Sequence, residues 1–261
     1  MNRSLFALEE GRNNIVFIDF GVKFGYITTS VRKMIPENIE QVRERIRATC
    51  FRCGRNPVDV TLVAVTKTFG ADAVRAALAA GVSDFGENYV QELNEKRQQL
   101  NDPAIRWHFI GHLQSNKVKY IAEYIHLIHS VDNVRLAEEL QKRAEKANRD
   151  IDILVEVHTT DEATKYGVPP EQTVELVKAI SAFPRVHVQG LMTMGPFSDD
   201  PNDSRQSFRT VAELKKQIER EGITGVSMRH MSMGMTHDFE VAIEEGATIV
   251  RIGTAIFGER K

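Results

Sequence analysis

The 261-residue chain lacks the features that would direct it to a membrane, out of the cell or onto nucleic acid. No apolar run approaches the roughly 18 residues that a membrane-spanning helix needs. The N-terminus has no charged segment followed by an apolar stretch and a small-residue cleavage site, so we expect a cytoplasmic protein. The formal net charge is only −2, which predicts no bulk attraction to nucleic acid or to an anionic membrane.

Cysteine is also scarce, because the chain has only Cys50 and Cys53, spaced C-x-x-C. This spacing allows a redox pair or half of a zinc site. We favour a plainer interpretation, two small apolar residues late in one amphipathic helix. A thioredoxin-like pair belongs at the start of a helix that follows a strand, and no second pair of ligands is available for zinc. We therefore expect no metal.

Residues 1–34 do not fit the regular pattern of the rest of the chain, and we interpret them as an N-terminal extension. Within this extension, residues 15–20 form a plausible short strand but carry no site chemistry. The regular part opens with Pro36, which is expected at the start of a helix. We assign residues 35–261 to a single domain.

Strand patterns alternate with helical patterns along the rest of this domain. Strands are expected at residues 60–67, 84–88, 106–111, 125–131, 151–158, 186–192, 225–232 and 248–252. The first is a run of β-branched and small apolar residues, which is typical of a parallel strand buried on both faces. We predict an α/β fold, a closed (β/α)8 TIM barrel. The alternative, an open doubly wound sheet, predicts a G-x-G-x-x-G turn that this sequence lacks.

The active sites of such barrels lie at the C-terminal ends of the strands. The first predicted strand ends there with Lys67. An unperturbed lysine has a pKa of about 10.4 and is a poor nucleophile at neutral pH. Partial desolvation, or a neighbouring cation such as Arg251 in the same cavity, would free the amine for addition to a carbonyl group. The alternative is a lysine that neutralises a carboxylate or a phosphate.

Two turns of small residues follow the last two predicted strands, at residues 232–236 and at Gly253–Thr254. Each turn offers backbone N–H groups and a hydroxyl, as phosphate sites of barrels do. Alternatively, both are tight turns that need glycine for their backbone angles. A lysine that can form a Schiff base, opposite a phosphate site, suits pyridoxal 5′-phosphate (PLP). His112 is near enough to the mouth to touch a ligand, whereas His108 is expected in the core or at the rim.

Several motifs occur in an order that resembles a known family. They are LVAVTKT (62–68), FGENYVQE (85–92), HFIGHLQSNK (108–117), SVD (130–132), GLM (190–192), MSMGM (231–235) and VRIGT (250–254). The sequence is similar to the PLP homeostasis proteins of the YggS/PROSC type, which are relatives of the alanine racemase N-terminal domain. The resemblance runs from about residue 35 to residue 258.

The resemblance implies a set of cofactor-binding residues, Lys67, Asn88, Met192, Ser232, Gly234, Met235, Arg251, Gly253 and Thr254. Lys67 would carry PLP as a Schiff base, and Ser232 with the glycine turns would hold the phosphate. Arg251 would face the pyridine nitrogen. Because arginine does not readily give up its proton, that nitrogen would stay unprotonated, which limits carbanion chemistry.

Two functions of different class follow from the resemblance. The favoured one is a non-catalytic, monomeric PLP carrier in PLP (vitamin B6) and amino-acid homeostasis, with PLP-dependent apo-enzymes as candidate recipients. The alternative is a PLP-dependent amino-acid racemase. Alanine racemases add a C-terminal β-domain with a second base, and this chain stops at Lys261. Racemisation needs proton donors on both faces of a carbanion, and Lys67 is the only evident base, so we assign no catalytic residue. A barrel that binds another phosphate ester without Schiff-base chemistry is a third option.

Overall fold

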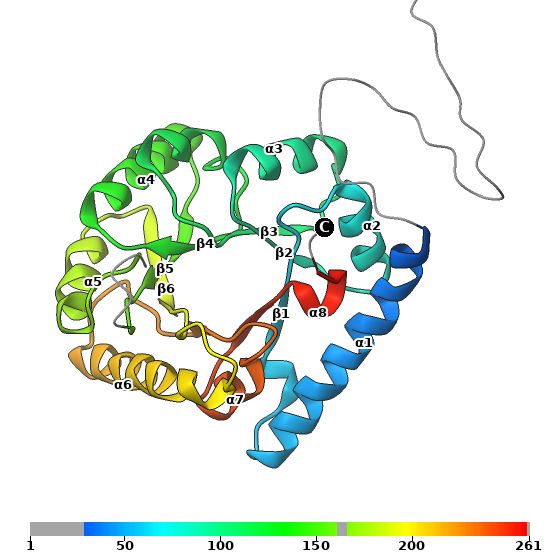
Figure 1. Ribbon diagram of the computed structural model, residues 1–261. Coiled ribbons are helices and arrows are strands. Elements are labelled where there is room, and N and C mark those ends of the chain that lie inside the picture. The colour runs from blue at the N-terminus through cyan, green and yellow to red at the C-terminus, as the bar shows by residue number, and fades with distance from the viewer. Residues whose placement is uncertain (1–28, 161–165, 260–261) are drawn as a thin grey trace, which may run out of the picture.

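A computed structural model describes residues 29–160 and 166–259 of the chain. Within these residues, eight parallel strands close into a barrel in chain order, with β8 pairing back to β1. Figure 1 shows the strands at the centre and the helices arranged around them. This closed topology confirms the predicted (β/α)8 barrel and excludes the open sheet.

The strands are β1 (Thr61–Val65), β2 (Asp84–Glu87), β3 (Arg106–Phe109), β4 (Leu127–Val131), β5 (Ile151–Glu156), β6 (Val186–Met192), β7 (His230–Ser232) and β8 (Ile249–Ile252). The α-helices are α1 (Thr29–Arg52), α2 (Ala71–Ala79), α3 (Val90–Gln99), α4 (Val134–Ala147), α5 (Thr173–Ser181), α6 (Arg205–Glu221), α7 (Phe239–Glu244) and α8 (Thr254–Phe257). Short 3-10 helices lie at η1 (Pro57–Asp59), η2 (Ser115–Tyr120), η3 (Pro170–Gln172) and η4 (Pro201–Ser204).

Several strand boundaries differ from the prediction by one or more residues, and turns of the backbone accompany two of these differences. The first strand ends at Val65 and not at Lys67. The Phe69 N–H donates to the Thr66 carbonyl 3.0 Å away, and Thr68 adopts a φ of 70°. Lys67 therefore lies in a turn that follows β1. The seventh strand begins only at His230, because Gly225 has a φ of 79° and bends the chain before it.

The predicted start of the first helix is wrong, because α1 begins at Thr29 and Pro36 lies inside it. Proline fits helical φ and forfeits one backbone hydrogen bond in this position. One face of α1 is buried through Ile35, Ile39, Val42, Ile46 and Cys50, which holds the helix on the barrel. The proposed boundary between residues 34 and 35 therefore falls within α1, and the predicted strand at residues 15–20 lies outside the described residues.

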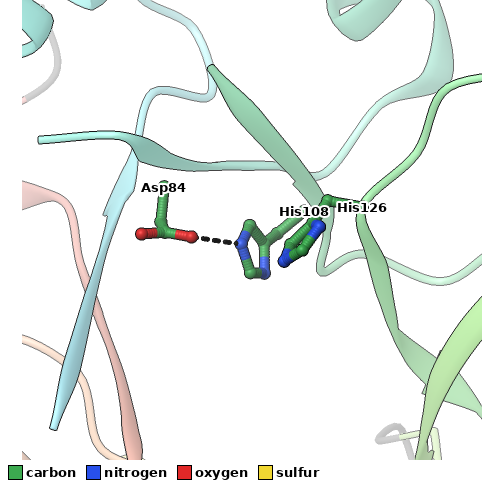
Figure 2. Close-up of side chains that lie close together, drawn as sticks. All are labelled: Asp84, His108 and His126. Atoms are coloured by element: carbon green, nitrogen blue, oxygen red, sulfur yellow. Dashed lines mark hydrogen bonds and ion pairs between the residues drawn. The ribbon is translucent and has the colours of Figure 1, made fainter. Parts of the chain in front are cut away.

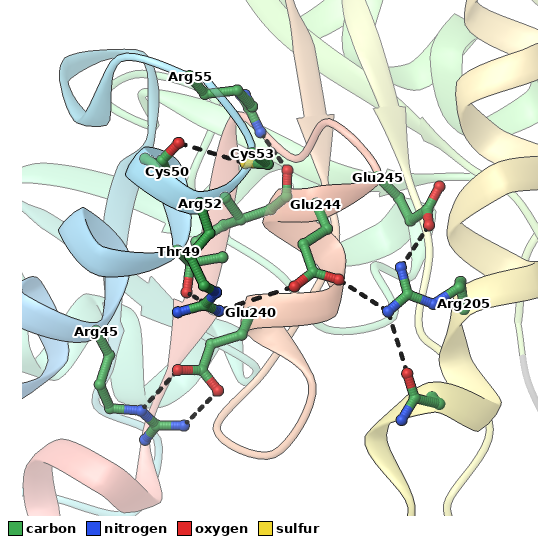
Figure 3. A network of polar contacts seen from close by, with 12 residues as sticks. Arg45, Thr49, Cys50, Arg52, Cys53, Arg55, Arg205, Glu240, Glu244 and Glu245 are labelled. Atoms are coloured by element: carbon green, nitrogen blue, oxygen red, sulfur yellow. Dashed lines mark hydrogen bonds and ion pairs between the residues drawn. The ribbon is translucent and has the colours of Figure 1, made fainter.

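Helix α1 closes the outer layer against the last elements of the chain. The Asn38 side chain donates to the Ile256 carbonyl of α8, 2.9 Å away. Figure 3 shows ion pairs between α1 and α7, where Arg45 meets Glu240 at 3.2 Å. Exposed pairs of this kind contribute little individually. Packing of the apolar face of α1 is the main term that holds the first helix beside the last.

The two cysteines are not joined by a disulfide and differ in their surroundings. Cys50 is buried on α1, whereas Cys53 follows the end of the helix and is exposed, and both are free thiols. The helix interpretation is thus confirmed for Cys50 alone. Among the described residues, no helix has both the length and the apolar character needed to cross a membrane.

The interior of the barrel is polar at several positions. A small apolar cluster inside it contains Val63, Leu127, Leu154, Met192 and Ile249. Four buried polar side chains from other strand positions are His108, His129, Ser232 and Arg251. A barrel core of this kind must satisfy the hydrogen bonds of its buried polar atoms, and those bonds determine the geometry of the site.

Candidate functional site

Lys67 is half-buried in the turn after β1, and its two neighbours in the chain fix that turn. The Thr66 carbonyl accepts a hydrogen bond from Lys96 Nζ at 2.6 Å. The Thr66 hydroxyl donates to Glu87 Oε1 at 2.5 Å. The Thr68 N–H donates to Glu92 Oε2 at 2.8 Å. Side chains of β2 and α3 therefore hold the backbone on both sides of Lys67.

A buried ion pair lies beneath this turn. Lys96 Nζ is 2.6 Å from Glu87 Oε1, and Glu87 is fully buried. Burial raises the pKa of Glu87, and the charge and hydrogen bond of Lys96 oppose that shift. Within the described residues, Glu87 Oε2 is buried without a hydrogen-bond partner. The Lys67 turn is thus held in place by the buried Glu87–Lys96 pair.

The predicted phosphate turn after β8 lies next to the Lys67 turn. A Cβ at position 253 would lie 3.4 Å from the Val65 carbonyl oxygen, so Gly253 is in close contact with the end of β1. The rings of Phe69 and Phe257 are 5.2 Å apart. The structure therefore brings the Lys67 turn and the Gly253–Thr254 turn to one side of the barrel mouth.

The turn after β7 packs against the turn after β8. The Arg251 N–H donates to the Gly234 carbonyl at 3.0 Å, and the Ala255 N–H donates to Thr236 Oγ1 at 3.3 Å. Gly234 has a φ of 90°, and a Cβ there would lie 2.6 Å from the Cβ of Ala242, so only glycine fits without strain. Met235 is exposed, and its N–H donates to Asp238 Oδ1 at 2.7 Å.

Arg251 and Ser232 meet inside the barrel, below these two turns. Arg251 Nη1 donates to the Ser232 carbonyl at 2.7 Å and to Ser232 Oγ at 2.6 Å. Arg251 Nη2 donates to the Thr193 carbonyl at 2.9 Å. Burial lowers the pKa of Arg251 to about 10, so the guanidinium stays a cation at neutral pH. The Ser232 hydroxyl is therefore a buried group with a cation beside it.

Asn88 and Met192 occupy different parts of the mouth. Asn88 follows β2, and its Oδ1 is buried without a hydrogen-bond partner in the described part of the chain. It lines a cavity of about 1100 Å³ together with Gly111, His112 and Tyr166. Lys67 is not among the residues that line this cavity. Met192 is buried and pairs with Ser232 in the sheet.

His112 and His108 behave as their positions in the sequence suggested. The His112 ring stacks on Tyr166 with centroids 3.8 Å apart, so it lies at the rim of the cavity. His108 is buried in the core. Both of its ring nitrogens are hydrogen-bonded.

Glu156 is a site residue that the sequence analysis missed. It ends β5, is buried and pairs with Met192 in the sheet. Burial raises its pKa to about 7, with the charge of Asp132 acting in the same direction and Arg251 opposing. A carboxyl group that titrates near neutral pH is a candidate acid or base. Its position at the C-terminal end of a strand was the signal that could have identified it.

Asp84, His108 and His126 bring potential metal-ligand atoms within 4.8 Å of one another, at the opposite end of the strands from Lys67. Figure 2 shows the Asp84 carboxylate directed at the His108 ring, with His126 beside it. Both Asp84 oxygens also accept hydrogen bonds from the Arg106 guanidinium. Because a cation already holds the carboxylate, we assign no metal to this cluster, and the expectation of a metal-free protein stays a prediction.

Comparison with known proteins gives the family. A model of the alanine racemase N-terminal domain matches residues 36–261. A pyridoxal phosphate homeostasis protein of Aquifex aeolicus (strain VF5) is 48% identical, over 86% of this chain and 98% of the relative. The chain belongs to the pyridoxal phosphate homeostasis protein family. The resemblance that the motifs carried is therefore confirmed, as is the alanine racemase N-terminal domain fold.

Solved structures agree with this assignment to the pyridoxal phosphate homeostasis family. The structure of PipY from Synechococcus elongatus PCC7942, described as having PLP bound, is 32% identical to this chain and has a TM-score of 0.75. The match covers 86% of this chain and 100% of PipY. An alanine racemase of Clostridium difficile 630 has a TM-score of 0.69 at 14% identity, over 86% of this chain and 57% of the racemase. The second likeness shows the fold alone.

Proposed function

We propose that this protein binds PLP at the C-terminal mouth of the barrel, with Lys67 as the attachment point. The observation that carries the proposal is the contact between the Lys67 turn and the Gly253–Thr254 turn, where Gly253 touches the end of β1. An amine and a group of phosphate donors on one side of the mouth suit a phosphorylated aldehyde. The bound PLP of PipY, a relative in the same family, supports the same ligand.

The residues at the mouth fit such a ligand. Asn88 Oδ1 is buried without a hydrogen-bond partner among residues 29–160 and 166–259, and a ligand hydroxyl or N–H would satisfy this acceptor. The glycine turns present backbone donors without a side chain that would block a phosphate. We propose that Gly234, Gly253 and Thr254 hold the phosphate at the rim, with Ser232 below them and Met192 in the wall.

Each side chain then has a defined task. PLP would supply an aldehyde, and Lys67 would hold it through its side-chain amine. Glu87 and Lys96 hold the backbone of Lys67 in place through Thr66. Arg251, a cation held by Ser232 and Thr193, would face the pyridine nitrogen and keep it unprotonated. Met235 would lie at the rim of the site, where its side chain is exposed. Its backbone N–H donates to Asp238 Oδ1 and holds the residue there.

We infer a carrier in PLP and amino-acid homeostasis rather than an enzyme. The curated relatives are named as homeostasis proteins, and an arginine beside the pyridine nitrogen weakens the cofactor as an electron sink. Transfer to PLP-dependent apo-enzymes belongs to this proposal, and the monomeric state and cytoplasmic location stay predictions. A racemase-like enzyme is the second candidate, favoured by Glu156, whose pKa of about 7 suits an acid–base group. Turnover in racemase assays that Glu156→Gln abolishes would establish that second function.

A titration of the purified protein with PLP tests the proposal. We expect a visible absorption band that borohydride bleaches, and loss of this band in Lys67→Ala. Lys142→Ala removes an exposed lysine of α4 and serves as the matched control, so it should retain the band. A Lys67→Ala protein that keeps the bleachable band would refute Lys67 as the attachment point. An absence of any band in the folded wild type would refute Schiff-base binding altogether.

A further inference from the structure

A chain of buried hydrogen bonds crosses the barrel interior from β8 to β2. Arg251 Nη1 is 2.6 Å from Ser232 Oγ, which is 2.9 Å from His129 Nδ1. His129 Nε2 is 2.9 Å from His108 Nδ1. His108 Nε2 is in turn 2.9 Å from Asp84 Oδ1. Each of these five residues is at most 6% exposed, so the atoms depend on one another for their hydrogen bonds.

The two ends of the chain fix its direction. A guanidinium can only donate and a carboxylate can only accept. Arg251 therefore donates to Ser232 Oγ, and His108 Nε2 donates to Asp84 Oδ1. When each ring carries one proton, His108 Nδ1 has no proton and accepts a hydrogen bond. His129 must then carry its proton on Nε2 and donate to His108. His129 Nδ1 then accepts the one proton of the Ser232 hydroxyl, so each ring nitrogen either donates or accepts one hydrogen bond.

The surroundings favour a neutral His129. Complete burial lowers the pKa of His129 well below its ordinary value, and the charge of Arg251 acts in the same direction. The pKa of Asp84 lies below its usual range, because hydrogen bonds from Arg106 and His108 outweigh the effect of burial. The titratable or charged groups that face the two histidines from the packed elements are Asp84, Arg106, His126, Asp152, His230 and Arg251.

We propose that His129 and His108 are positioning residues that decide whether Ser232 can donate its proton to a bound phosphate. The inference rests on the proposed function, which makes Ser232 a phosphate ligand. A hydroxyl has one proton, so Ser232 cannot donate to His129 and to a phosphate oxygen at once. Donation to the phosphate requires a proton on His129 Nδ1, and His129 Nε2 must then accept from His108 Nδ1.

This reversal adds one proton to the pair of histidines. Before it, His129 and His108 each carry one proton, on Nε2. After it, His129 carries one on Nδ1 and donates to Ser232, while His108 carries two and donates to His129 and to Asp84. The extra proton comes from solvent, and the Asp84 carboxylate offsets the new charge. Binding of a phosphate ester through Ser232 is therefore coupled to uptake of one proton.

The test uses pyridoxine 5′-phosphate, which lacks the aldehyde and so leaves the Lys67 amine out of the equilibrium. Between pH 7 and 9 the phosphate is a dianion, since its second pKa is about 6. For each unit of increase in pH, the wild-type affinity should fall by about tenfold more than the affinity of His129→Gln. The glutamine amide can donate to Ser232 without taking up a proton from solvent. Titration of the pyridine ring is common to all variants and cancels from this difference. Calorimetry in two buffers should show one more proton taken up by the wild type.

His187→Gln is the matched control, because His187 is a partly exposed histidine that faces Asp150 at 3.3 Å outside the chain of hydrogen bonds. It should keep the wild-type slope, and a flattened slope in this control would overturn the proposal. Parallel slopes for the wild type and His129→Gln would overturn it as well.

Nitrogen-15 NMR of the histidine rings keeps the proposal open to refutation even if His129→Gln does not fold. The wild type without ligand should show neutral His129 and His108, each protonated on Nε2, and pyridoxine 5′-phosphate should move the His129 proton to Nδ1. A proton on His129 Nδ1 before binding contradicts the chain direction. No binding of the ester refutes the proposed phosphate site, whereas binding with unchanged ring tautomers refutes only the role of the histidines.

Discussion

The two sides of the barrel mouth hold their polar groups by different means. On the β1 side, the Lys67 turn is fastened from the helical layer by the buried Glu87–Lys96 ion pair, 2.6 Å apart. On the β8 side, Arg251 and Ser232 are held from inside the barrel by a chain that passes through His129. The first arrangement has fixed charges and fixes a backbone. The second has exchangeable protons, which suits a group that must change its hydrogen bond when a ligand binds.

The largest effect is expected from Lys96→Met, which removes one partner of the ion pair on the β1 side. Glu87 would be left buried and unpaired, which costs about 3–5 kcal/mol of unfolding free energy. Urea denaturation measures this loss. The double variant Glu87→Gln/Lys96→Met should recover most of it, since both charges are gone. Exposed ion pairs contribute less than about 1 kcal/mol to the free energy of unfolding. A loss this small in Lys96→Met would show that the β1 side is not held by a buried ion pair.

Glu156 lies in the wall between the two sides, and Glu156→Gln should give the next largest change in the free energy of unfolding. Burial raises the pKa of Glu156 to about 7, above the value of about 4.3 expected in an unfolded chain. The folded state binds this proton more tightly, so the stabilisation is complete below pH 4 and is lost as the pH rises to 7. We expect Glu156→Gln to be more stable than the wild type by about 3.6 kcal/mol at pH 8 and similar to it at pH 4.

Denaturation curves of the two proteins across this pH range measure that difference. Glu213→Gln, at an exposed position of α6, is the control and should follow the wild type at every pH. A constant offset between Glu156→Gln and the wild type would mean that Glu156 does not titrate in this range.

A smaller effect is expected from Gly234→Ala on the β8 side. Gly234 has a φ of 90°, and a Cβ would lie 2.6 Å from the Cβ of Ala242. Gly225, with a φ of 79° and nothing within 4 Å, is the matched control. Both substitutions incur about 1 kcal/mol for the left-handed backbone, and Gly234→Ala should lose about 2 kcal/mol more in thermal unfolding. Equal losses would show that the turn can open, and the rigid phosphate site would lose its basis.

Local patterns allowed much of the fold to be predicted from the sequence. The alternation of strand and helical patterns located all eight strands in the described residues, although β2, with the sequence DFGE, has no apolar run. The start of α1 could not be predicted, since Pro36 is typical of a first helical turn and yet lies inside this helix. The end of β1 was also missed, because a φ of 70° at Thr68 is unusual for a β-branched residue.

The candidate site was predicted less completely than the fold. Motifs pointed to Lys67, Gly234 and Gly253, which local turn chemistry marks as special. The partner of Ser232 could not be found in this way, because His129 is 103 residues away in the chain. Glu87 faces the helical layer while Asp84 faces the barrel interior, and a strand of four residues gives too little alternation to predict either orientation.

The central claim is that the Lys67 amine and the late glycine turns serve one ligand. The most direct measurement is peptide mapping by mass spectrometry after the PLP-loaded protein has been reduced with borohydride. We expect one phosphopyridoxyl group per chain, on Lys67. A group fixed on Lys117, or one distributed over several lysines, would contradict it.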